Sequence, residues 1–231
     1  MIKKNSSSLM TQNSKSGVLL HQSKNKQLSK SGTKCEFCKN NAETVLEVTN
    51  VFLCRRCYNR ILEKRTLRFI GKTKMIKPYD KVTLIADGSA GSGVLLSIFQ
   101  ILLSKLPFSV FVFSKNSEGK KQAEKYNFKE VKKKTGKIMS PLLLDDASRE
   151  FLSSILENKP KKALRVGYKS GREYFPLLKI ERIQAEKYCN FRKIPFSKRI
   201  NKTDADIMIL DIAKAKPSIN FCLIKTREQL K

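Results

Sequence analysis

The stretch of sequence that decides the fold is KVTLIADGSAGSGVLLSIFQILLSKLPFSVFVF, residues 81–113. Its first six residues, Lys81–Ala86, form a short apolar run typical of a buried strand, and Phe108–Phe113 form a second. Between them, Asp87–Gly93 is a loop rich in Gly and Ser, and Val94–Lys105 has the length and apolar character of a helix. Strand, turn, helix and strand in so few residues predict a βαβ unit. We therefore expect an α/β fold with a parallel sheet and a right-handed crossover.

Two further elements are predicted on the C-terminal side of this unit. Pro141–Leu144 has the pattern of another buried strand, and Asp145 or Asp146 would cap a helix that runs to about Glu157. Tyr174–Tyr188 is predicted as a third helix of the same domain. The C-terminal quarter has weak signals, and no internal repeat is visible.

Four cysteines precede the βαβ unit in two closely spaced pairs. Cys35 and Cys38 form one Cys-x2-Cys pair, and Cys54 and Cys57 form the second after a spacer of fifteen residues. Each pair places two thiolates on one tight turn, and two such pairs complete a tetrahedral shell around Zn²⁺. We predict a structural zinc site here. Two disulfides, or a spacing that arose by chance, are the alternatives.

The remaining two cysteines, Cys189 and Cys222, lie outside any such pair. A single cysteine among apolar neighbours is most often a small core residue, which is the prediction for both. A persulfide carrier or an iron–sulfur ligand is the alternative, although a cluster needs three or four placed thiolates. The one histidine, His21, lies in the N-terminal segment, which excludes histidine-dependent catalysis in an ordered site.

A basic helix is predicted directly after the cysteines. Apolar residues recur near helical spacing from about Tyr58 to Ile70, and Gly71 would end the helix. Arg60, Lys64 and Arg68 fall on the other positions. They form a basic face that could contact phosphates or simply be solvated.

The net charge of the chain is its strongest compositional feature. There are 48 Lys and Arg against 20 Asp and Glu, a formal charge of +28, which favours a polyanionic partner such as RNA, DNA or anionic lipid. Because Lys outnumbers Arg by 36 to 12, compositional drift could supply part of this excess. No run approaches 18 apolar residues, so a membrane span is excluded.

Composition also divides the chain into three parts. Residues 1–34 contain seven Lys and no acidic residue, and residues 1–33 are predicted as a disordered basic tail rather than a targeting signal. Residues 34–71 are predicted as the four-cysteine zinc finger plus the basic helix. Residues 72–231 are predicted as the α/β domain.

The glycine-rich loop alone is weak evidence for a phosphate site, but the elements around it make it more informative. A Gly/Ser loop between a strand and a helix can hold phosphates with backbone N–H groups, but it can also be only a tight turn. This loop lacks the Gly-Lys-Ser/Thr ending of a Walker A motif and does not match GxGxxG. Paired cysteines, a basic helix and a strand entering such a loop together resemble the PP-loop ATP-pyrophosphatases of tRNA thiolation.

The loop departs from the pattern of the active members of that family, Ser-Gly-Gly-x-Asp-Ser. Asp87 replaces the first Ser and Ser89 the second Gly, while Gly88 and Ser92 match. Gly91 replaces the Asp, which removes an oxygen ligand for magnesium, and Asp87 places a carboxylate where a phosphate would sit. The later cysteines of the active members are also missing. The chain therefore resembles the non-catalytic family, cytoplasmic tRNA 2-thiolation protein 2, over roughly residues 34–190.

This resemblance implies a function. The chain would be an accessory subunit for 2-thiolation of the wobble uridine (5-methoxycarbonylmethyl-2-thiouridine formation) in cytoplasmic tRNAs for lysine, glutamate and glutamine. It would form a heterodimer with a catalytic PP-loop subunit, with sulfur arriving on a thiocarboxylated ubiquitin-related carrier protein. Zinc would be its metal, and no ATP is expected. The alternatives are an active ATP-dependent sulfurtransferase with a divergent loop, and an unrelated zinc-ribbon protein that binds nucleic acid.

Candidate RNA contacts are basic residues in three clusters, which would act by displacing counterions from phosphates. Surface solvation is the alternative for any single member. The clusters are Arg55, Arg56, Arg60, Lys64, Arg65 and Arg68 around the cysteines; Lys120, Lys121, Lys132, Lys133 and Lys134; and Arg192, Lys193, Lys198 and Arg199.

Overall fold

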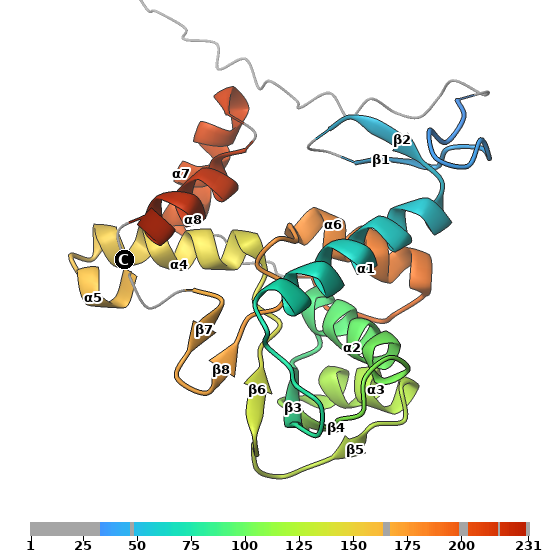
Figure 1. The fold of residues 1–231 in the computed structure, drawn as a ribbon. Helices are drawn as coiled ribbons and strands as arrows, with labels where there is room; N and C mark the ends of the chain where they lie inside the picture. Colours follow the sequence, from blue (N-terminus) through green and yellow to red (C-terminus); the bar gives the residue numbers. More distant parts are fainter. Residues whose placement is uncertain (1–32, 47–48, 164–166, 199–202, 217, 230–231) are drawn as a thin grey trace, which may run out of the picture.

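The fold is built on a six-stranded sheet, which lies in the lower part of Figure 1 with α1 (Arg55–Lys72), α2 (Ala90–Leu103) and α6 (Arg182–Arg192) above it. The computed structural model describes residues 33–46, 49–163, 167–198, 203–216 and 218–229, so the predicted basic tail lies almost wholly outside the described residues. The strands, in their order across the sheet, are β5 (Lys129–Glu130), β4 (Ser109–Ser114), β3 (Lys81–Ala86), β6 (Lys137–Met139), β8 (Glu173–Tyr174) and β7 (Lys169–Ser170). All neighbours pair in parallel except β7, which is antiparallel to β8. The predicted α/β fold with a mainly parallel sheet is confirmed.

The predicted βαβ unit forms the centre of the sheet. In β3, Leu84 pairs with Val112 of β4 on one side and with Met139 of β6 on the other. Helix α2 (Ala90–Leu103) connects β3 to β4, and α3 (Ser117–Lys125) connects β4 to β5. Every residue of α2 from its start to Phe99 is buried. A helix that is apolar on all sides needs such cover, which explains its run of Val, Leu and Ile.

Helix α2 begins earlier than the sequence predicts. Val94 was the expected first residue, but the helix starts at Ala90 because Ser89 acts as its N-cap. The Ser89 hydroxyl accepts a hydrogen bond from the Ser92 backbone N–H at 3.2 Å. The connecting loop is therefore only Asp87–Ser89. Gly91 and Gly93, which looked like loop residues, lie in the first turn of the helix.

The strand predicted over Pro141–Leu144 is wrong. The strand is β6, which ends at Met139, and the last ladder bond is donated by Ser140 N–H to the Tyr174 carbonyl. Pro141 has no N–H to continue the ladder, so the chain leaves the sheet there. Helix α4 (Leu144–Leu156) ends as predicted, but its N-cap is Leu143, and the expected caps Asp145 and Asp146 lie in its first turn.

The helix predicted over Tyr174–Tyr188 also begins too early. Tyr174 ends strand β8, and α6 (Arg182–Arg192) begins eight residues later. Its start is set by a capping box, in which the Glu181 side chain accepts from the Gln184 backbone N–H and the Gln184 side chain accepts from the Glu181 backbone N–H. Pro176 lies in the connection, where a helix would have lost a backbone hydrogen bond.

The cysteine-rich part of the chain packs on the α/β core through one helix. A small antiparallel sheet of β1 (Thr44–Leu46) and β2 (Val51–Leu53) leads into α1 (Arg55–Lys72). The predicted basic helix is confirmed, although it runs through Gly71 and ends at Lys72. Buried side chains of this region belong to the same hydrophobic core as β3 and α2.

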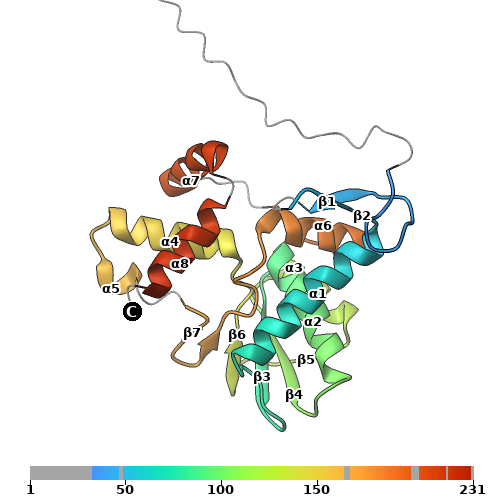
Figure 2. The same ribbon diagram turned by 45° about the horizontal axis from the view of Figure 1, so that its top comes forward.

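The C-terminal quarter forms helices that the sequence did not indicate. Helices α7 (Asp204–Ala215) and α8 (Ile219–Gln229) pack on α4 with the short α5 (Pro160–Ala163), at the side of the sheet (Figure 2). Leu144, Phe175 and Ile224 lie in this second, smaller core. Only the Thr203–Asp206 capping box could have marked α7 in the sequence.

The two isolated cysteines are both packed, to different degrees. Cys189 is fully buried, as predicted, and Cys222 is half-buried on α8. Burial raises the pKa of the Cys189 thiol to about 12, so it stays protonated at neutral pH. A protonated, enclosed thiol behaves as a small apolar core residue.

No helix among the described residues combines the length and the apolar character needed to cross a membrane.

A buried polar chain ties α1 to the α/β core. Ser97 Oγ on α2 lies 2.8 Å from Tyr188 Oη on α6, and Tyr188 donates to Glu63 Oε1 on α1 at 2.9 Å. Arg192 also donates to Glu63, which keeps this carboxylate compensated. Burial raises the pKa of Tyr188 above its usual value, so it acts as a hydrogen-bond donor throughout the physiological range.

Replacing Tyr188 should weaken this connection. Tyr188→Phe leaves Glu63 and Ser97 without their shared partner and should lower the free energy of unfolding by about 1–3 kcal/mol in urea denaturation. Tyr168→Phe is the matched control because that ring is 47% exposed, and it should change stability by less than about 0.5 kcal/mol. Equal effects of the two substitutions would show that the buried chain contributes nothing.

Candidate functional site

The four paired cysteines come together in one cluster. Their Sγ atoms all lie within 4.8 Å of one another, and those of Cys38 and Cys54 are 3.4 Å apart. Four sulfurs around a tetrahedral Zn²⁺, at the usual Zn–S distance of about 2.3 Å, would be roughly 3.8 Å apart. The cluster therefore has the donor set and the compactness of a metal centre, and the alternative of two disulfides is not seen because all four are free thiols.

Local backbone geometry places each pair. The first pair lies on a turn closed by hydrogen bonds from Cys35 N–H to the Asn40 carbonyl and from Lys39 N–H to the Cys35 carbonyl. In the second pair, Cys54 is the N-cap of α1 and Cys57 lies in its first turn. A metal held here would thus join the turn directly to the start of the basic helix.

The electrostatics of the cluster favour a bound cation. Burial opposes ionisation of Cys35, but backbone N–H groups, beginning with that of Cys54, outweigh it and lower the pKa to about 6. Burial and the neighbouring thiols raise the pKa of Cys57 to about 12. Four thiolates cannot form together at neutral pH unless a cation compensates them. The residues fit Zn²⁺, and the same donor set would also accept iron.

The glycine-rich loop lies at the carboxyl end of β3, where the sheet changes direction. The chain proceeds from β3 to β4 on one side, and β6 lies on the other, a switch point at which open α/β sheets commonly bind ligands. A hollow of about 430 Å³ is present there. It is lined by Asp87, Ser89, Ala90, Gly91, Lys115, Ser140, Pro141, Leu142, Leu143, Asp146, Arg149, Arg182, Glu186, Ser197 and Lys198.

Several polar groups of the loop bond within the loop or to neighbouring segments of the protein. Asp87 Oδ1 accepts the Ser89 N–H at 3.1 Å, which is a donor that a phosphate oxygen would otherwise use. The Ser92 hydroxyl is fully buried and donates to Gln122 Oε1. The Gly88 carbonyl accepts from Ser197 N–H. The Ser89 N–H and the Ser92 hydroxyl are thus already engaged within the protein.

Gly91 is the position at which the sequence resemblance expects an Asp in active members, and a side chain at Gly91 would meet the backbone in this structure. A Cβ at this position would lie 2.3 Å from the Pro141 carbonyl oxygen and 3.3 Å from the Leu143 side chain. The obstruction is backbone, so it cannot rotate away. The connection from β6 to α4 therefore packs directly against the backbone of α2 at Gly91.

Two of the four cations that line the hollow, Arg149 and Arg182, are engaged by carboxylates. Asp146 accepts from both Arg149, at 2.9 Å, and Arg182. Arg149 also reaches Asp206 of α7 at 3.4 Å. Burial raises the pKa of Asp145, although the backbone N–H of Arg182 opposes the shift. The sequence did not single out this group, because its members come from three helices far apart along the chain.

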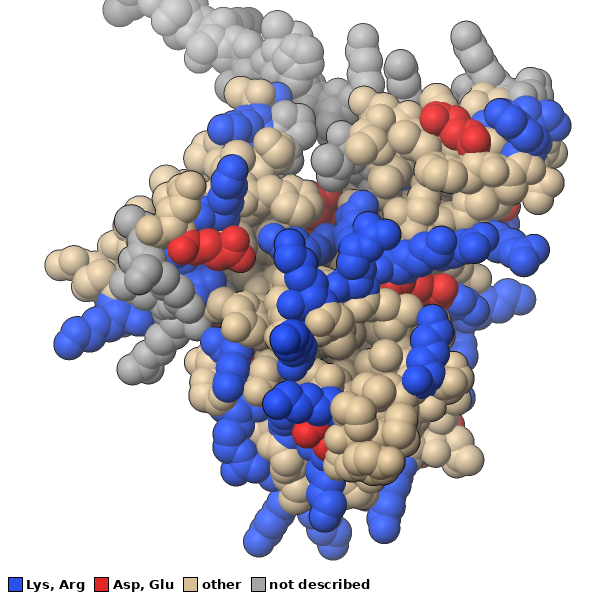
Figure 3. Space-filling model, viewed as in Figure 1, with Lys and Arg blue, Asp and Glu red and all other residues tan. Residues whose placement is uncertain are grey.

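The basic residues of α1 divide into a stripe and two structural contacts. Five of the six exposed members follow one another at intervals of four residues, and we call them the α1 stripe: Arg56, Arg60, Lys64, Arg68 and Lys72. Residues four apart lie on one face, roughly 6 Å apart along the axis. Figure 3 shows Lys and Arg side chains following this helix across one face of the molecule. The sequence analysis missed Lys72, although the four-residue interval would have identified it.

Two basic residues of α1 that were predicted to contact RNA are engaged within the protein. Arg55 pairs with Glu43 and lies 5.8 Å from the centroid of the Phe191 ring. Arg65 donates to Gln184 Oε1 at 3.2 Å and so ties α1 to α6. Both side chains therefore have a structural explanation.

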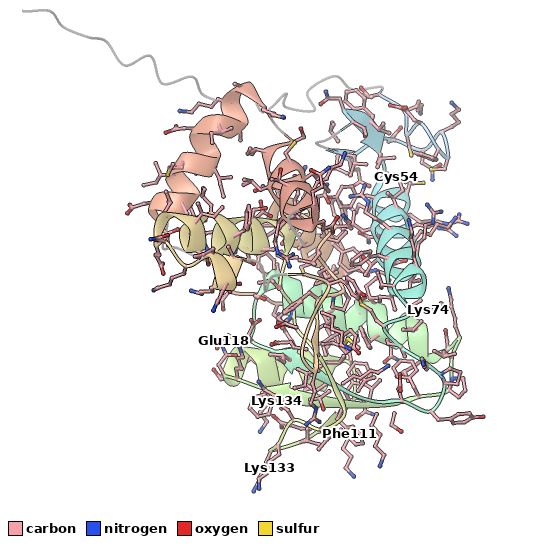
Figure 4. All side chains as sticks on the ribbon, turned by 60° about the vertical axis from the view of Figure 1, so that its left-hand side comes forward. Cys54, Lys74, Phe111, Glu118, Lys133 and Lys134 are labelled. Carbon is pink, nitrogen blue, oxygen red and sulfur yellow. The ribbon has the colours of Figure 1, made fainter. Side chains whose placement is uncertain are left out.

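Of the other two predicted clusters, one includes a loop far from the start of α1, and the other contacts α1 through a bond within the protein. Figure 4 shows Lys133 and Lys134 at the opposite end of the molecule from Cys54. The ammonium group of Lys134 lies 5.3 Å from the Phe113 ring centroid, and Lys132 is exposed in the same loop.

In the third predicted cluster, Arg192 bonds to Glu63, and Lys193 is the left-handed C-cap of α6. Lys120 and Lys121 are exposed on α3, Lys198 lines the hollow, and Arg199 lies outside the described residues.

Comparison with known proteins supports the fold. No family model and no curated protein sequence matches the chain. Among solved structures, it is similar to the U34-tRNA thiolase NcsA from Methanococcus maripaludis with its [4Fe-4S] cluster, with a TM-score of 0.71 and 13% identity over 85% of this chain and 86% of that one. Weaker similarities are to an NMN synthetase from Francisella tularensis (TM-score 0.39, 14% identity, 78% and 97% covered) and to an NH3-dependent NAD synthetase from Campylobacter jejuni (0.37, 15%, 74% and 92%). The chain therefore has a PP-loop-like α/β fold that carries a four-cysteine cluster.

Loss of one cysteine should remove the metal and loosen α1. We expect Cys54→Ser to abolish stoichiometric zinc in elemental analysis of the purified protein, and to lower Tm by roughly 5 °C or more. Cys222→Ser is the matched control, because that half-buried thiol lies outside the cluster. Zinc content that is unchanged in Cys54→Ser would refute the site, and iron in place of zinc would correct the identity of the metal.

The close approach at Gly91 predicts that even one methyl group is harmful. Gly91→Ala should lower the free energy of unfolding by about 1–3 kcal/mol, because the Pro141 carbonyl must move. Gly71→Ala, where nothing lies within 4 Å of the new Cβ, should instead add about 0.5–1 kcal/mol by favouring the helix. If Gly91→Ala also stabilises the protein in urea unfolding, the connection from β6 to α4 is not packed as described.

Proposed function

We propose that this protein is a non-catalytic, RNA-binding accessory subunit for 2-thiolation of the wobble uridine in tRNAs for lysine, glutamate and glutamine. It would act in the cytoplasm in a heterodimer with a catalytic PP-loop subunit. That subunit would take sulfur from a thiocarboxylated ubiquitin-related carrier protein. Zinc in the four-cysteine cluster would have a structural role.

The closed position at Gly91 is the observation that carries the non-catalytic role. An ATP-pyrophosphatase of the resembled kind needs a carboxylate there to hold magnesium, and the Pro141 carbonyl lies 2.3 Å from any Cβ at this position. Asp87 adds a negative charge beside the loop and occupies the Ser89 N–H. Like charges at contact repel, so the loop disfavours a nucleoside triphosphate.

The α1 stripe supports RNA as the partner. Four consecutive like-charged pairs at a spacing of four residues destabilise an isolated helix. The single acidic residue of α1, Glu63, bonds to Tyr188 and Arg192 instead of relieving the stripe. A polyanion lying along the stripe would offset this repulsion and release its own counterions. The similarity in fold to a U34-tRNA thiolase favours tRNA as the RNA that binds this stripe.

The hollow at the loop favours one other candidate, an active sulfurtransferase that uses a divergent loop. Lys115 and Lys198 line this hollow and could meet phosphates. Direct measurement of ATP binding separates the two functions. Calorimetry of the purified protein with ATP and Mg²⁺ should show no binding if the proposal is correct, and binding with tRNA-dependent release of pyrophosphate would establish the active enzyme.

Depletion of the protein, followed by complementation, tests the function itself. We expect the 2-thiouridine content of the affected tRNAs to fall on depletion and to return with the wild-type gene. A gene carrying Arg60→Gln, Lys64→Gln and Arg68→Gln should restore it poorly. In vitro, this triple variant should weaken tRNA binding and reduce the slope of log K against log salt by about 2–3.

A matched triple variant controls for the loss of three charges. Lys214→Gln, Lys216→Gln and Lys225→Gln remove the same charge from exposed positions on and beside α7 and α8. This variant should leave the salt slope and complementation near wild type. Unchanged thiolation after depletion would end the proposal, and equal losses in both triple variants would show that net charge, not the α1 stripe, binds the RNA.

A further inference from the structure

A second cationic hollow lies at the opposite edge of the sheet from the glycine-rich loop. It has a volume of about 370 Å³ and lies where β3 and β6 begin and where β7 turns into β8. Its lining residues are Asp80, Lys81, Gly136, Lys137, Lys169, Gly171, Arg172 and Tyr174. In Figure 3, several Lys and Arg side chains project from this lower end of the molecule. Neither the loop site nor the α1 stripe uses it.

The charges in this hollow are not balanced internally. Asp80 is the single acid among the lining residues, and it bonds to Lys137 Nζ at 2.7 Å. Lys137 is also held by the Met75 carbonyl at 3.0 Å, so it is fixed in place. Lys81, Lys169 and Arg172 remain as the excess positive charge. An anion entering the hollow would meet three cations around a neutralised pair.

The hollow is shaped by rigid elements. Gly136 has φ +67°, and a Cβ there would lie 2.0 Å from the Lys81 carbonyl, so the chain passes directly over the start of β3. Arg172 donates to the Gly136 carbonyl at 3.1 Å, which ties the turn between β7 and β8 to the same point. The ring of Tyr174 lies below two ammonium groups, those of Lys137 at 5.7 Å and Lys169 at 5.3 Å from its centroid.

Next to the hollow, an aromatic ring projects into solvent. Tyr79 is 85% exposed, the largest exposed fraction among the large apolar and aromatic side chains described. Its φ of +65° is in the left-handed region, which is unfavourable for a bulky residue. The conformation is held by Tyr79 N–H donating to the Pro107 carbonyl, and by Lys77 N–H donating to Asp80 Oδ2, each at 2.7 Å. Backbone strain of this kind concentrates at functional sites.

The two features are adjacent. Tyr79 directly precedes Asp80 and Lys81, which line the hollow, and it is anchored at the start of β4. Tyr79 lies two residues from Lys81, and Lys169 lies three strand spacings of about 4.8 Å beyond β3, so the ring and the hollow lie within the reach of a single-stranded segment of a few nucleotides. A flat aromatic face beside a group of cations is how proteins hold single-stranded nucleic acid, with the base stacked and the phosphate paired.

We infer that this edge of the sheet is a second RNA site, which binds a single-stranded segment with one base stacked on Tyr79 and a phosphate in the hollow between Lys81, Lys169 and Arg172. It shares with the proposed function only the class of ligand, and it requires neither thiolation nor a partner subunit. In a folded RNA this site would select an unpaired segment, because a stacked base has to leave its own helix.

The absence of tryptophan from the chain allows a direct test of stacking. In Tyr79→Trp, the single tryptophan should be quenched when an oligouridine of about 12 nucleotides binds the full-length, metal-loaded protein, because that length suits single-strand sites. Met208→Trp places the reporter on α7, where the side chain is 41% exposed, and its fluorescence should not change. Quenching in neither variant, or equally in both, would overturn the inference.

Two further variants separate stacking from charge. Tyr79→Ala should lower affinity for oligouridine without changing affinity for inorganic polyphosphate. Lys169→Gln with Arg172→Gln should lower both affinities, by roughly tenfold at low salt. Lys214→Gln with Lys216→Gln is the control of equal charge and should change neither. If Tyr79→Ala weakens polyphosphate as much as RNA, or the two double variants behave alike, the site is not the one described.

Thermal melts of each variant keep misfolding apart from loss of binding. This assay is also independent of thiolation in cells. If the Tyr79 variants do not affect RNA binding but the complementation experiment gives the expected result, the α1 stripe alone binds RNA. If the Tyr79 variants do affect RNA binding but thiolation is unchanged after depletion, the protein binds RNA for another function.

Discussion

The packing of α2 against the connection from β6 to α4 is the constraint on which the rest of the structure depends. The first ten residues of α2 are all buried, so the sheet, α1 and α6 must each cover one of its sides. At Gly91 this packing is so close that the Pro141 carbonyl excludes any side chain. The same contact completes the core and underlies the proposed non-catalytic role, so the protein's stability and that proposal rest on one physical feature.

Repulsion between basic residues is a second feature of the structure, and it destabilises α1. Like charges at intervals of four residues along α1 repel one another, and the acids that could relieve them are used elsewhere, as Glu63 is by Tyr188 and Arg192. The two basic surfaces differ in kind. The α1 stripe is a row of independent cations suited to a phosphate backbone. The hollow beside Tyr79 combines fixed cations with an aromatic ring, and such a combination distinguishes an unpaired nucleotide from a duplex.

Much of the fold could be predicted because its signals are local. Two such signals depend on neighbouring residues alone. They are the apolar runs of β3 and β4, and the Cys-x2-Cys spacing of Cys35 with Cys38 and of Cys54 with Cys57. The predictions were wrong where hydrogen bonds to other residues, rather than the local apolar or glycine pattern, set the secondary structure. Pro141–Leu144 is as apolar as a strand, yet it leaves the sheet because β8 offers Ser140 its last ladder bond and proline cannot continue. Gly91 and Gly93 have the composition of a loop, yet they are helical because Ser89 caps them.

By itself, the sequence determined the fold class, the four-cysteine donor set, the altered loop and the excess of basic residues, because spacing and composition are properties of the chain alone. Only the tertiary structure decided which basic residues are free of contacts within the protein and so available to bind an anionic partner. Arg55, Arg65 and Arg192 lie in the predicted clusters but bond within the protein, whereas Lys72 completes the α1 stripe. It also brought Lys81, Lys169 and Arg172 together beside Tyr79. Lys81 and Arg172 lie about ninety residues apart, and they come together because β3, β6 and β8 run in parallel and begin at one end of the sheet, while the antiparallel β7 adds Lys169 beside β8.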